Sequence, residues 1–212
     1  MVLGIDIILR SLWIALGALF WGSIFGISIG IWFALKTFKF KRVLFLILYL
    51  FLSLPPITIG LFLYLTFSRS GAFGFLGWLF TPKVMIIAQA IMATPLISII
   101  TFNSLEHRGK KIYETALLLG AKPYEIIKKI LKEIRFSLGL AVATAFGRVI
   151  SEVGASTLIG GDIVRKTRVM STSILTETRM GNFNYALKQA LALILISLLI
   201  NFFILIWQGK TE

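Results

Sequence analysis

Residues Ser11–Leu35 read SLWIALGALFWGSIFGISIGIWFAL, an apolar run without a charged side chain. An α-helix needs about 20 mostly apolar residues to cross the roughly 30 Å hydrocarbon core of a bilayer, so this run is long enough to span it. A secretory signal has a shorter apolar region, of about 7–15 residues, and ends at a small-residue cleavage site. No clear site of that kind follows this run, which therefore predicts an uncleaved membrane span.

Four further segments have similar length and hydropathy, although each contains a proline or a charged residue. Proline removes a backbone hydrogen bond and bends a helix, so Pro55-Pro56 and Pro95 predict bent spans. The Pro55-Pro56 pair is also able to divide its segment into two half-spans. Together the segments predict an all-α polytopic membrane protein with about five transmembrane helices, in one domain over residues 1–212. The four segments are Val43–Phe67, Val84–Leu105, Phe136–Gly160 and Tyr185–Trp207.

The composition favours a membrane protein and excludes several kinds of site. Hydrophobic residues make up 58% of the chain and charged residues 15%, whereas soluble domains are nearer half apolar and a quarter charged. The chain has no cysteine and one histidine, His107. This excludes disulfides and thiol chemistry and leaves too few ligands for a conventional metalloenzyme, so we expect no metal site and no cofactor. The net charge is +13, and the charged residues lie between apolar runs. We therefore expect a lipid membrane rather than a nucleic acid as partner.

Basic residues are concentrated in the first and third predicted loops, which lie on one side of the membrane if there are five spans. Lysine and arginine collect in cytoplasmic loops. This side is therefore predicted to be cytoplasmic, with the N-terminus outside and the C-terminus inside, although the outer side also carries basic residues. The cytoplasmic set comprises Lys36, Lys39, Lys41, Arg42, Arg108, Lys110, Lys111, Lys122, Lys128, Lys129, Lys132 and Arg135.

The cytoplasmic loop over residues 106–135 is too long for a simple connector and has helical signals of its own. Gly120 suits the end of a first helix and Pro123 the first turn of a second. After Tyr124, isoleucines recur at helical spacing on one face and lysines occupy the opposite face. The pattern predicts helix–glycine–helix. Such a helix suits the surface of an anionic membrane, and it equally suits docking of a cytoplasmic partner.

Residues 114–121 of this loop read ETALLLGA. They resemble the EAA motif of permease subunits of ATP-binding-cassette (ABC) importers, in which this loop seats in a cleft of the ATPase and transmits its closure. Thr115 stands where the motif usually has alanine, and Lys132-Glu133 stands where a Leu-Pro pair is common. The resemblance implies that the residues coupling the chain to the ATPase are Glu114, Ala116, Gly120 and Ala121.

The fourth predicted span contains two charged residues, Arg148 and Glu152, four positions apart and therefore on one helical face. Charges within a span are costly and usually face a bundle interior or water, which makes these two, with the adjacent small residue Gly154, candidates for a pathway or gate. Two alternatives remain open. The charges could form a neutralising pair that only sustains packing, or the helix could end early and leave both at the interface.

The segment from Gly147 to Ala155 and the outer loop over residues 161–184 are most similar to tungstate-type permeases, which are related to molybdate and sulfate permeases. In the outer loop, basic side chains could attract a tetrahedral dianion, and hydroxyl and N–H groups could complete its hydrogen bonds. The alternative, which we favour, is that they dock a separate binding protein or act as a gate. The residues concerned are Arg165, Lys166, Arg168 and Thr172.

The resemblance implies a type I importer permease in the cell membrane, acting as a homodimer with cytoplasmic ATPase subunits and an extracytoplasmic binding protein. Its expected substrate is an oxyanion. Tungstate is the favoured candidate, with molybdate and sulfate as alternatives. The sequence lacks a Gly-x-x-x-x-Gly-Lys-Ser/Thr phosphate loop, so we expect no enzyme activity in this chain, with ATP and magnesium bound by the partner ATPase. An integral-membrane enzyme or assembly factor is the alternative from another class, and a secondary transporter is a third.

Overall fold

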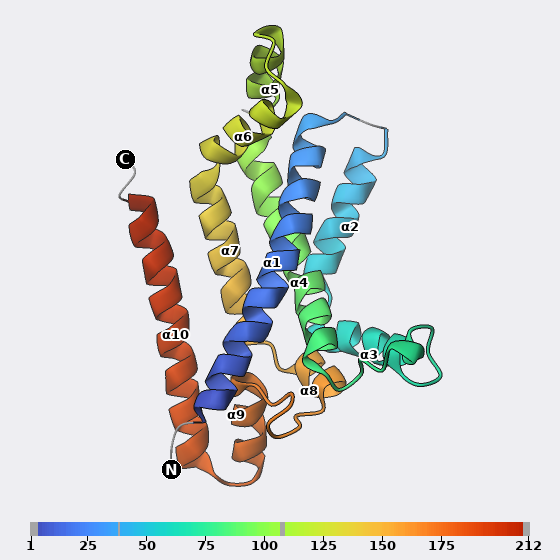
Figure 1. Cartoon of the computed structure of the whole chain (residues 1–212), viewed down its shortest axis with the longest axis vertical. Coiled ribbons are helices and arrows are strands. Elements are labelled where there is room, and N and C mark those ends of the chain that lie inside the picture. The colour runs from blue at the N-terminus through green and yellow to red at the C-terminus, as the bar shows by residue number, and fades with distance from the viewer. Residues whose placement is uncertain (1–3, 38, 107–108, 210–212) are drawn as a thin grey trace.

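The computed structural model describes residues 4–37, 39–106 and 109–209, and this part of the chain folds as an all-α bundle (Figure 1). His107 and Arg108, both in the basic loop, and the C-terminal Lys210 lie outside the described residues. The helices in chain order are α1 (Ile5–Leu35), α2 (Lys41–Ser53), α3 (Pro56–Phe67), the short 3-10 helix η1 (Gly74–Leu76), α4 (Pro82–Leu105), α5 (Gly109–Leu118), α6 (Pro123–Glu133), α7 (Arg135–Ile150), α8 (Gly154–Gly160), α9 (Met170–Arg179) and α10 (Phe183–Gly209).

Three helices, α1, α4 and α10, are each long and apolar enough to cross a membrane. Two bent helix pairs, α2 with α3 and α7 with α8, are apolar enough when each is taken together, so the described residues hold up to five candidate spans if each bent pair counts as one span. The polytopic all-α fold predicted from the sequence is therefore confirmed. Helix α4 stays continuous across Pro95, so this proline does not divide its span.

The second span breaks between α2 and α3, at Pro55-Pro56, with a bend of 96°. Neither proline has an N–H to continue the α2 hydrogen-bond ladder, and a residue before proline is pushed out of the helical region. Leu54 and Pro55 accordingly adopt extended ψ angles of 133° and 131°. Pro56 then occupies the first turn of α3, where a missing N–H costs nothing. The division into two half-spans, which the sequence left open, is thus observed.

The fourth span bends by 58° between α7 and α8. Helix α7 ends at Ile150 and α8 begins at Gly154. The prediction that Arg148 and Glu152 share one helical face is therefore wrong for Glu152, which lies in the break. The physical reason is that the carboxylate of Glu152 bonds to the first N–H groups of α8, which stabilises a new helix start there.

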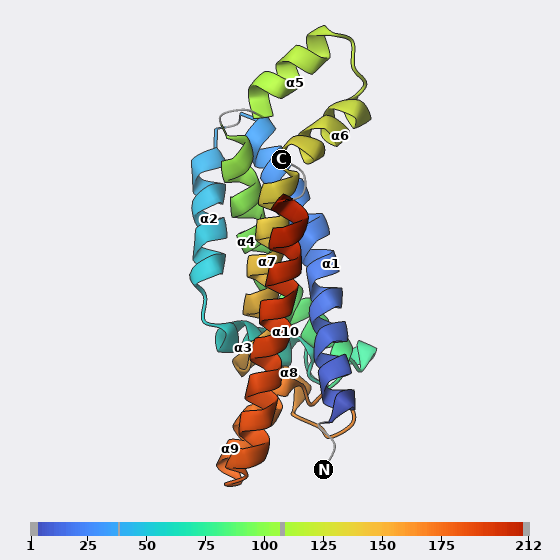
Figure 2. The ribbon, with the colours of Figure 1, turned by 90° about the vertical axis from the view of Figure 1, so that its left-hand side faces the viewer.

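Helix α1 packs closely along α4, and the two lie side by side through the centre of the bundle (Figures 1 and 2). Three glycines four residues apart, Gly22, Gly26 and Gly30, make this approach possible. A Cβ atom on Gly26 would lie 2.8 Å from the Cβ of Ile97, and one on Gly22 would lie 2.8 Å from the Cβ of Ala93. Small residues permit this close contact between membrane helices.

The two ends of the bundle differ in character. At one end, the α5–α6 hairpin projects beyond the spans, and at the opposite end lie α3, α8 and α9 (Figure 1). Helix α10 stands at the side of the bundle, next to α7 and α9, and most of its apolar side chains are exposed. An apolar exterior of this kind is expected where lipid or another membrane chain covers the surface.

Candidate functional site

The turn between α5 and α6 is built around Gly120. Gly120 has a φ of 75°, in the left-handed region that glycine occupies without strain. The N–H of Ala121 donates to the carbonyl of Ala116 at 3.0 Å, and the N–H of Gly120 donates to that of Leu117 at 3.0 Å. These two bonds form a Schellman motif, which ends a helix sharply. The predicted helix–glycine–helix arrangement is therefore observed.

The tip of the hairpin exposes apolar side chains. Leu118 is 88% exposed and Leu119 81%, and both lie immediately before Gly120. Among the predicted coupling residues, Glu114 and Gly120 are also exposed, whereas Ala116 and Ala121 pack toward the core at this end of the bundle. Exposed leucines on a projecting hairpin are characteristic of a surface that another protein covers.

Helix α6 attaches the hairpin to the spans. Its start is closed by the Glu125 carboxylate, which accepts a hydrogen bond from the Lys122 N–H at 2.7 Å. Ile126 and Ile130 are fully buried in a cluster with Phe102 and other core residues. Lys128, Lys129 and Lys132 stand on the exposed face, as the periodicity predicts. Because Ile126 and Ile130 are buried against the spans, these two side chains do not face lipid, whereas Ile127 is 45% exposed.

Arg148 connects the two broken spans. Its guanidinium donates to the Leu52 carbonyl at 2.9 Å, near the end of α2 where helix carbonyls lack internal partners. The side chain is half-buried, and no ion pair joins it to Glu152 among the residues that the structure describes. The neutralising pair considered from the sequence is therefore absent there, and each charge has its own structural partner.

Glu152 holds the start of α8 and is only 6% exposed. Its carboxylate accepts bonds from the N–H of Ala155 at 2.7 Å, from the N–H of Ser156 at 2.9 Å and from the Ser156 hydroxyl at 2.7 Å. Its own carbonyl accepts a bond from the Ser171 hydroxyl at 2.7 Å. A carboxylate at a helix N-terminus satisfies orphan N–H groups and is favoured by the helix dipole. These contacts make Glu152 a structural cap.

Gly154 allows the start of α8 to pack closely against the start of α3. A Cβ atom there would lie 3.3 Å from the Cβ of Ile57 in α3. Helix α3 also packs on α8 through Gly60, whose added Cβ would lie 2.7 Å from the Cα of Ala155. The small residues noted in the sequence therefore serve close packing between the two half-spans.

A polar face on α7 includes Arg148. Thr144 within α7 and Ser151, the residue directly after its end, are exposed, and with Arg148 they follow helical spacing of four and three residues. A Cβ atom on Gly147 would meet nothing within 4 Å, so this face borders open space. Thr144 and Ser151 were not among the residues predicted from the sequence. Their helical spacing within an apolar span was the feature of the sequence that could have identified them.

The loop over residues 161–184, which the sequence predicts to be the outer loop, folds around Asp162, a residue not singled out from the sequence. Arg168 pairs with its carboxylate at 3.0 Å and lies 3.6 Å from that of Glu177. The hydroxyls of Thr172 and Thr176 each donate to Asp162 at 2.7 Å. Two of the predicted anion or docking contacts, Arg168 and Thr172, are thus engaged within the loop itself.

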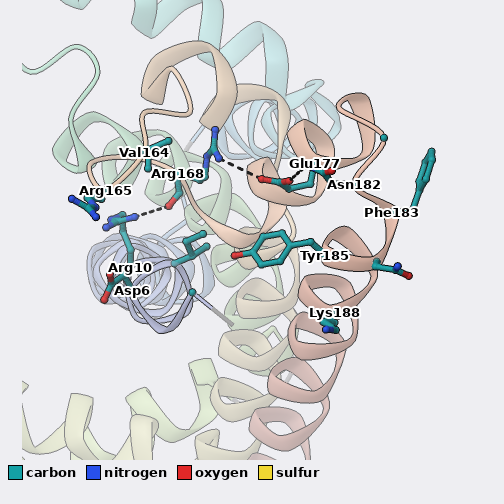
Figure 3. A pocket seen from close by; sticks show the side chains of 14 residues that line it. Asp6, Arg10, Val164, Arg165, Arg168, Glu177, Asn182, Phe183, Tyr185 and Lys188 are labelled. Atoms are coloured by element: carbon teal, nitrogen blue, oxygen red, sulfur yellow. Dashed lines mark hydrogen bonds and ion pairs between the residues drawn. The ribbon is translucent and has the colours of Figure 1, made fainter. Parts of the chain in front are cut away.

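The other two predicted contacts, Arg165 and Lys166, are exposed. Arg165 borders a cleft of about 860 Å³ between the start of α1, the outer loop and the start of α10 (Figure 3). Arg10, which donates to the Arg168 carbonyl at 3.0 Å, and Lys188 also line this cleft. The cleft therefore presents several cations near the end of the bundle opposite the α5–α6 hairpin.

No group of His, Asp or Glu side chains suited to a metal occurs within residues 4–37, 39–106 and 109–209.

Known proteins resemble the chain over most of its length. Residues 26–211 match the family described as "Binding-protein-dependent transport system inner membrane component". The tungstate uptake system permease protein TupB of Peptoclostridium acidaminophilum is 38% identical, over 82% of this chain and 77% of its own length. TupB of Campylobacter jejuni is also 38% identical, over 78% and 69%. The sulfate transport system permease protein CysT of Escherichia coli is 32% identical, over 74% and 60%.

Solved structures share the fold. The inward-facing MetNI methionine ABC transporter contains a chain that superposes with a TM-score of 0.78 at 19% identity, covering 98% of this chain and 96% of the other. A chain of a bacterial ABC transporter that imports alginate gives a TM-score of 0.81 at 18% identity, covering 100% and 81%. The relatives are transport permeases rather than enzymes. This chain therefore belongs to the family of binding-protein-dependent transport system inner membrane components, the permease subunits of ABC importers.

Proposed function

We propose that this permease carries tungstate across the cell membrane, as one of two identical membrane subunits driven by cytoplasmic ATPases. The substrate assignment rests on the 38% identity with two tungstate uptake permeases. The observation that carries the mechanism is the projecting α5–α6 hairpin with its exposed Leu118 and Leu119. A rigid hairpin, closed by Gly120 and anchored by α6, transmits movement of a bound ATPase to the spans.

The orientation follows from the charge distribution. The α5–α6 end carries most of the lysines and arginines and is assigned to the cytoplasm, with the N-terminus on the opposite side. Closure of the ATPases would then push on one end of the bundle while the binding protein rests on the other. Arg165 and Lys166, exposed at that outer end, are suited to an acidic patch on the binding protein.

The pathway is assigned to the polar face of α7. Thr144, Arg148 and Ser151 lie where the span borders open space, and the Arg148 guanidinium has further N–H donors beyond the one bound to Leu52. A passing dianion would meet one positive charge, which lowers the cost of leaving water without trapping it. The hydroxyls of Thr144 and Ser151 donate to the carbonyls of Leu140 and Gly147 at 2.8 and 2.7 Å, so each would have to rotate to donate to the dianion. The second copy closes the other side of this pathway, since a single bundle leaves the face open.

Uptake of metal tests the proposal. The permease, its ATPase and its binding protein are expressed in cells lacking oxyanion importers, and intracellular tungsten and molybdenum are measured by mass spectrometry. We expect tungsten to accumulate in a manner that needs an active ATPase and that excess molybdate or sulfate hardly suppresses. Accumulation of molybdenum in preference to tungsten would overturn the substrate assignment. Accumulation of neither metal by an intact complex would overturn it too and would mean that the importer carries another substrate.

Arg148→Gln tests the pathway in the same cells, with Arg135→Gln at the start of α7 as a matched control. We expect Arg148→Gln to reduce tungsten uptake roughly tenfold or more, the cost of losing a charged hydrogen bond. The ATPase should still co-purify with both variants. Equal tungsten uptake by the two variants would contradict the assignment of Arg148 to the pathway.

A further inference from the structure

A cavity of about 570 Å³ lies between the ends of α2 and α4 that face the α5–α6 hairpin. Three cations line it, Lys39, Lys41 and Arg42, together with a single carboxylate, Glu106. No ion pair within the described ranges engages any of the three cations. The cavity therefore has an excess of positive charge at the level where a span leaves the membrane.

Aromatic rings hold one of these cations in place. The Nζ of Lys41 lies 5.2 Å from the ring centre of Phe102, a cation–π distance. Phe45 packs against Phe102 with ring centres 4.4 Å apart, and Tyr49 packs against Phe45 at 5.1 Å. Lys41 is half-buried as a result. This ordering distinguishes it from Lys128 on α6, which stands on an exposed face.

The outer surface of α2 continues this site along the membrane. No residue of α2 is buried, and Arg42, Leu46 and Leu50 lie four residues apart on one helical face. Leu46 is 57% exposed and Leu50 is 64% exposed. A cation at the membrane boundary is thus followed by an apolar strip toward the bilayer centre. This order of charge and apolar surface matches a phospholipid, whose phosphate lies above its acyl chains.

We propose that this cavity binds the phosphate head group of an anionic phospholipid from the leaflet on the hairpin side, with the acyl chains along Leu46 and Leu50. Basic pockets between helices on the cytoplasmic side recognise anionic head groups in this way. A bound lipid would fill the groove between α2 and α4 next to the α1–α2 connection. It would thereby fix the position of α2, which has few contacts with the rest of the bundle.

Native mass spectrometry of the purified permease–ATPase complex tests this proposal. The complex is titrated with phosphatidylglycerol, with phosphatidylcholine of the same acyl chains, and with soluble glycerol phosphate. We expect phosphatidylglycerol to be retained preferentially, and its affinity to fall roughly fivefold for each cation removed from the cavity. Equal retention of the two lipids, or equal binding of glycerol phosphate without acyl chains, would overturn the proposal.

Two matched pairs of variants locate the effect. Asn103 also lines the cavity, so Asn103→Glu adds a repelling carboxylate while keeping every basic residue that sets orientation, and Asn103→Gln is its neutral control. The triple change K39Q/K41Q/R42Q is compared with K128Q/K129Q/K132Q, which removes the same charge from exposed α6. Only Asn103→Glu and the first triple variant should lose the preference for phosphatidylglycerol. An unchanged preference in Asn103→Glu, with the ATPase still associated and the unfolding temperature preserved, would refute the site independently of whether tungstate is the substrate.

Discussion

At the residue scale, Glu152 and Gly120 each fix the geometry of one break in the chain. The Glu152 carboxylate accepts three hydrogen bonds at the start of α8 while almost completely buried. Gly120 provides the left-handed turn between α5 and α6. Neither role involves chemistry on a substrate, and both decide where a helix begins or ends. Changes at these two positions should therefore act on local structure first.

Glu152→Gln should destabilise the folded permease by about 1–2 kcal/mol, because the amide keeps only one good acceptor and places a donor against the N–H groups of α8. The measurement is the thermal unfolding temperature in detergent. Glu133→Gln is the control, because Glu133 is exposed at the end of α6. Equal unfolding temperatures for the two variants would contradict the capping role.

Gly120→Val should strain the hairpin by about 1–2 kcal/mol, since a β-branched residue is disfavoured at a φ of 75°. We expect weaker co-purification of the ATPase, with the spans intact. Asn is tolerated in the left-handed region, so Gly120→Asn should retain the ATPase. If Gly120→Val binds the ATPase as firmly as the parent does, the hairpin is not the coupling element.

At the element scale, the contact between α1 and α4 depends on the glycines of α1. A Cβ atom added to Gly26 would meet Ile97, whereas a Cβ atom added to Gly147 on α7 would meet nothing within 4 Å. Both residues lie within helices, so replacing either by alanine gains the same helix propensity, about 1 kcal/mol. The difference between the two variants therefore reports packing alone.

Gly26→Ala should lower the stability of the bundle by about 1–3 kcal/mol relative to Gly147→Ala, because its Cβ would lie 2.8 Å from the Cβ of Ile97 and 3.0 Å from the Thr94 carbonyl oxygen. Unfolding temperatures of the two purified variants, measured side by side, check this. A Gly26→Ala variant as stable as Gly147→Ala would mean that α1 can move away from α4 without cost.

At the scale of the whole molecule, the two ends of the bundle are proposed to meet different partners on opposite sides of the membrane. The hairpin end carries exposed leucines, and the opposite end carries Arg165, Lys166 and the cationic cleft. The structure places the proposed lipid cavity at the hairpin end, and the charge bias assigns that end to the cytoplasmic leaflet. Determining which end faces the cytoplasm therefore bears on all of these assignments.

Labelling of single cysteines can settle the orientation, because the chain has none of its own. Leu118→Cys and Arg165→Cys both introduce an exposed thiol, at opposite ends. A membrane-impermeant maleimide applied to intact spheroplasts should label Arg165→Cys and should reach Leu118→Cys only after permeabilisation. The reverse pattern would invert the proposed topology and place the hairpin outside the cell.

The sequence by itself determined the apolar segments and the helix–glycine–helix hairpin, and its Pro55-Pro56 pair marked where a division was possible. These features depend on local properties, namely apolar length, missing N–H groups and conformational preference. Tertiary structure decided the roles of the charged side chains. Arg148 binds a carbonyl 96 positions away, and Lys41 lies over Phe102 from another helix. Spacing along one helix cannot specify such partners, because they are set by how separate helices pack together.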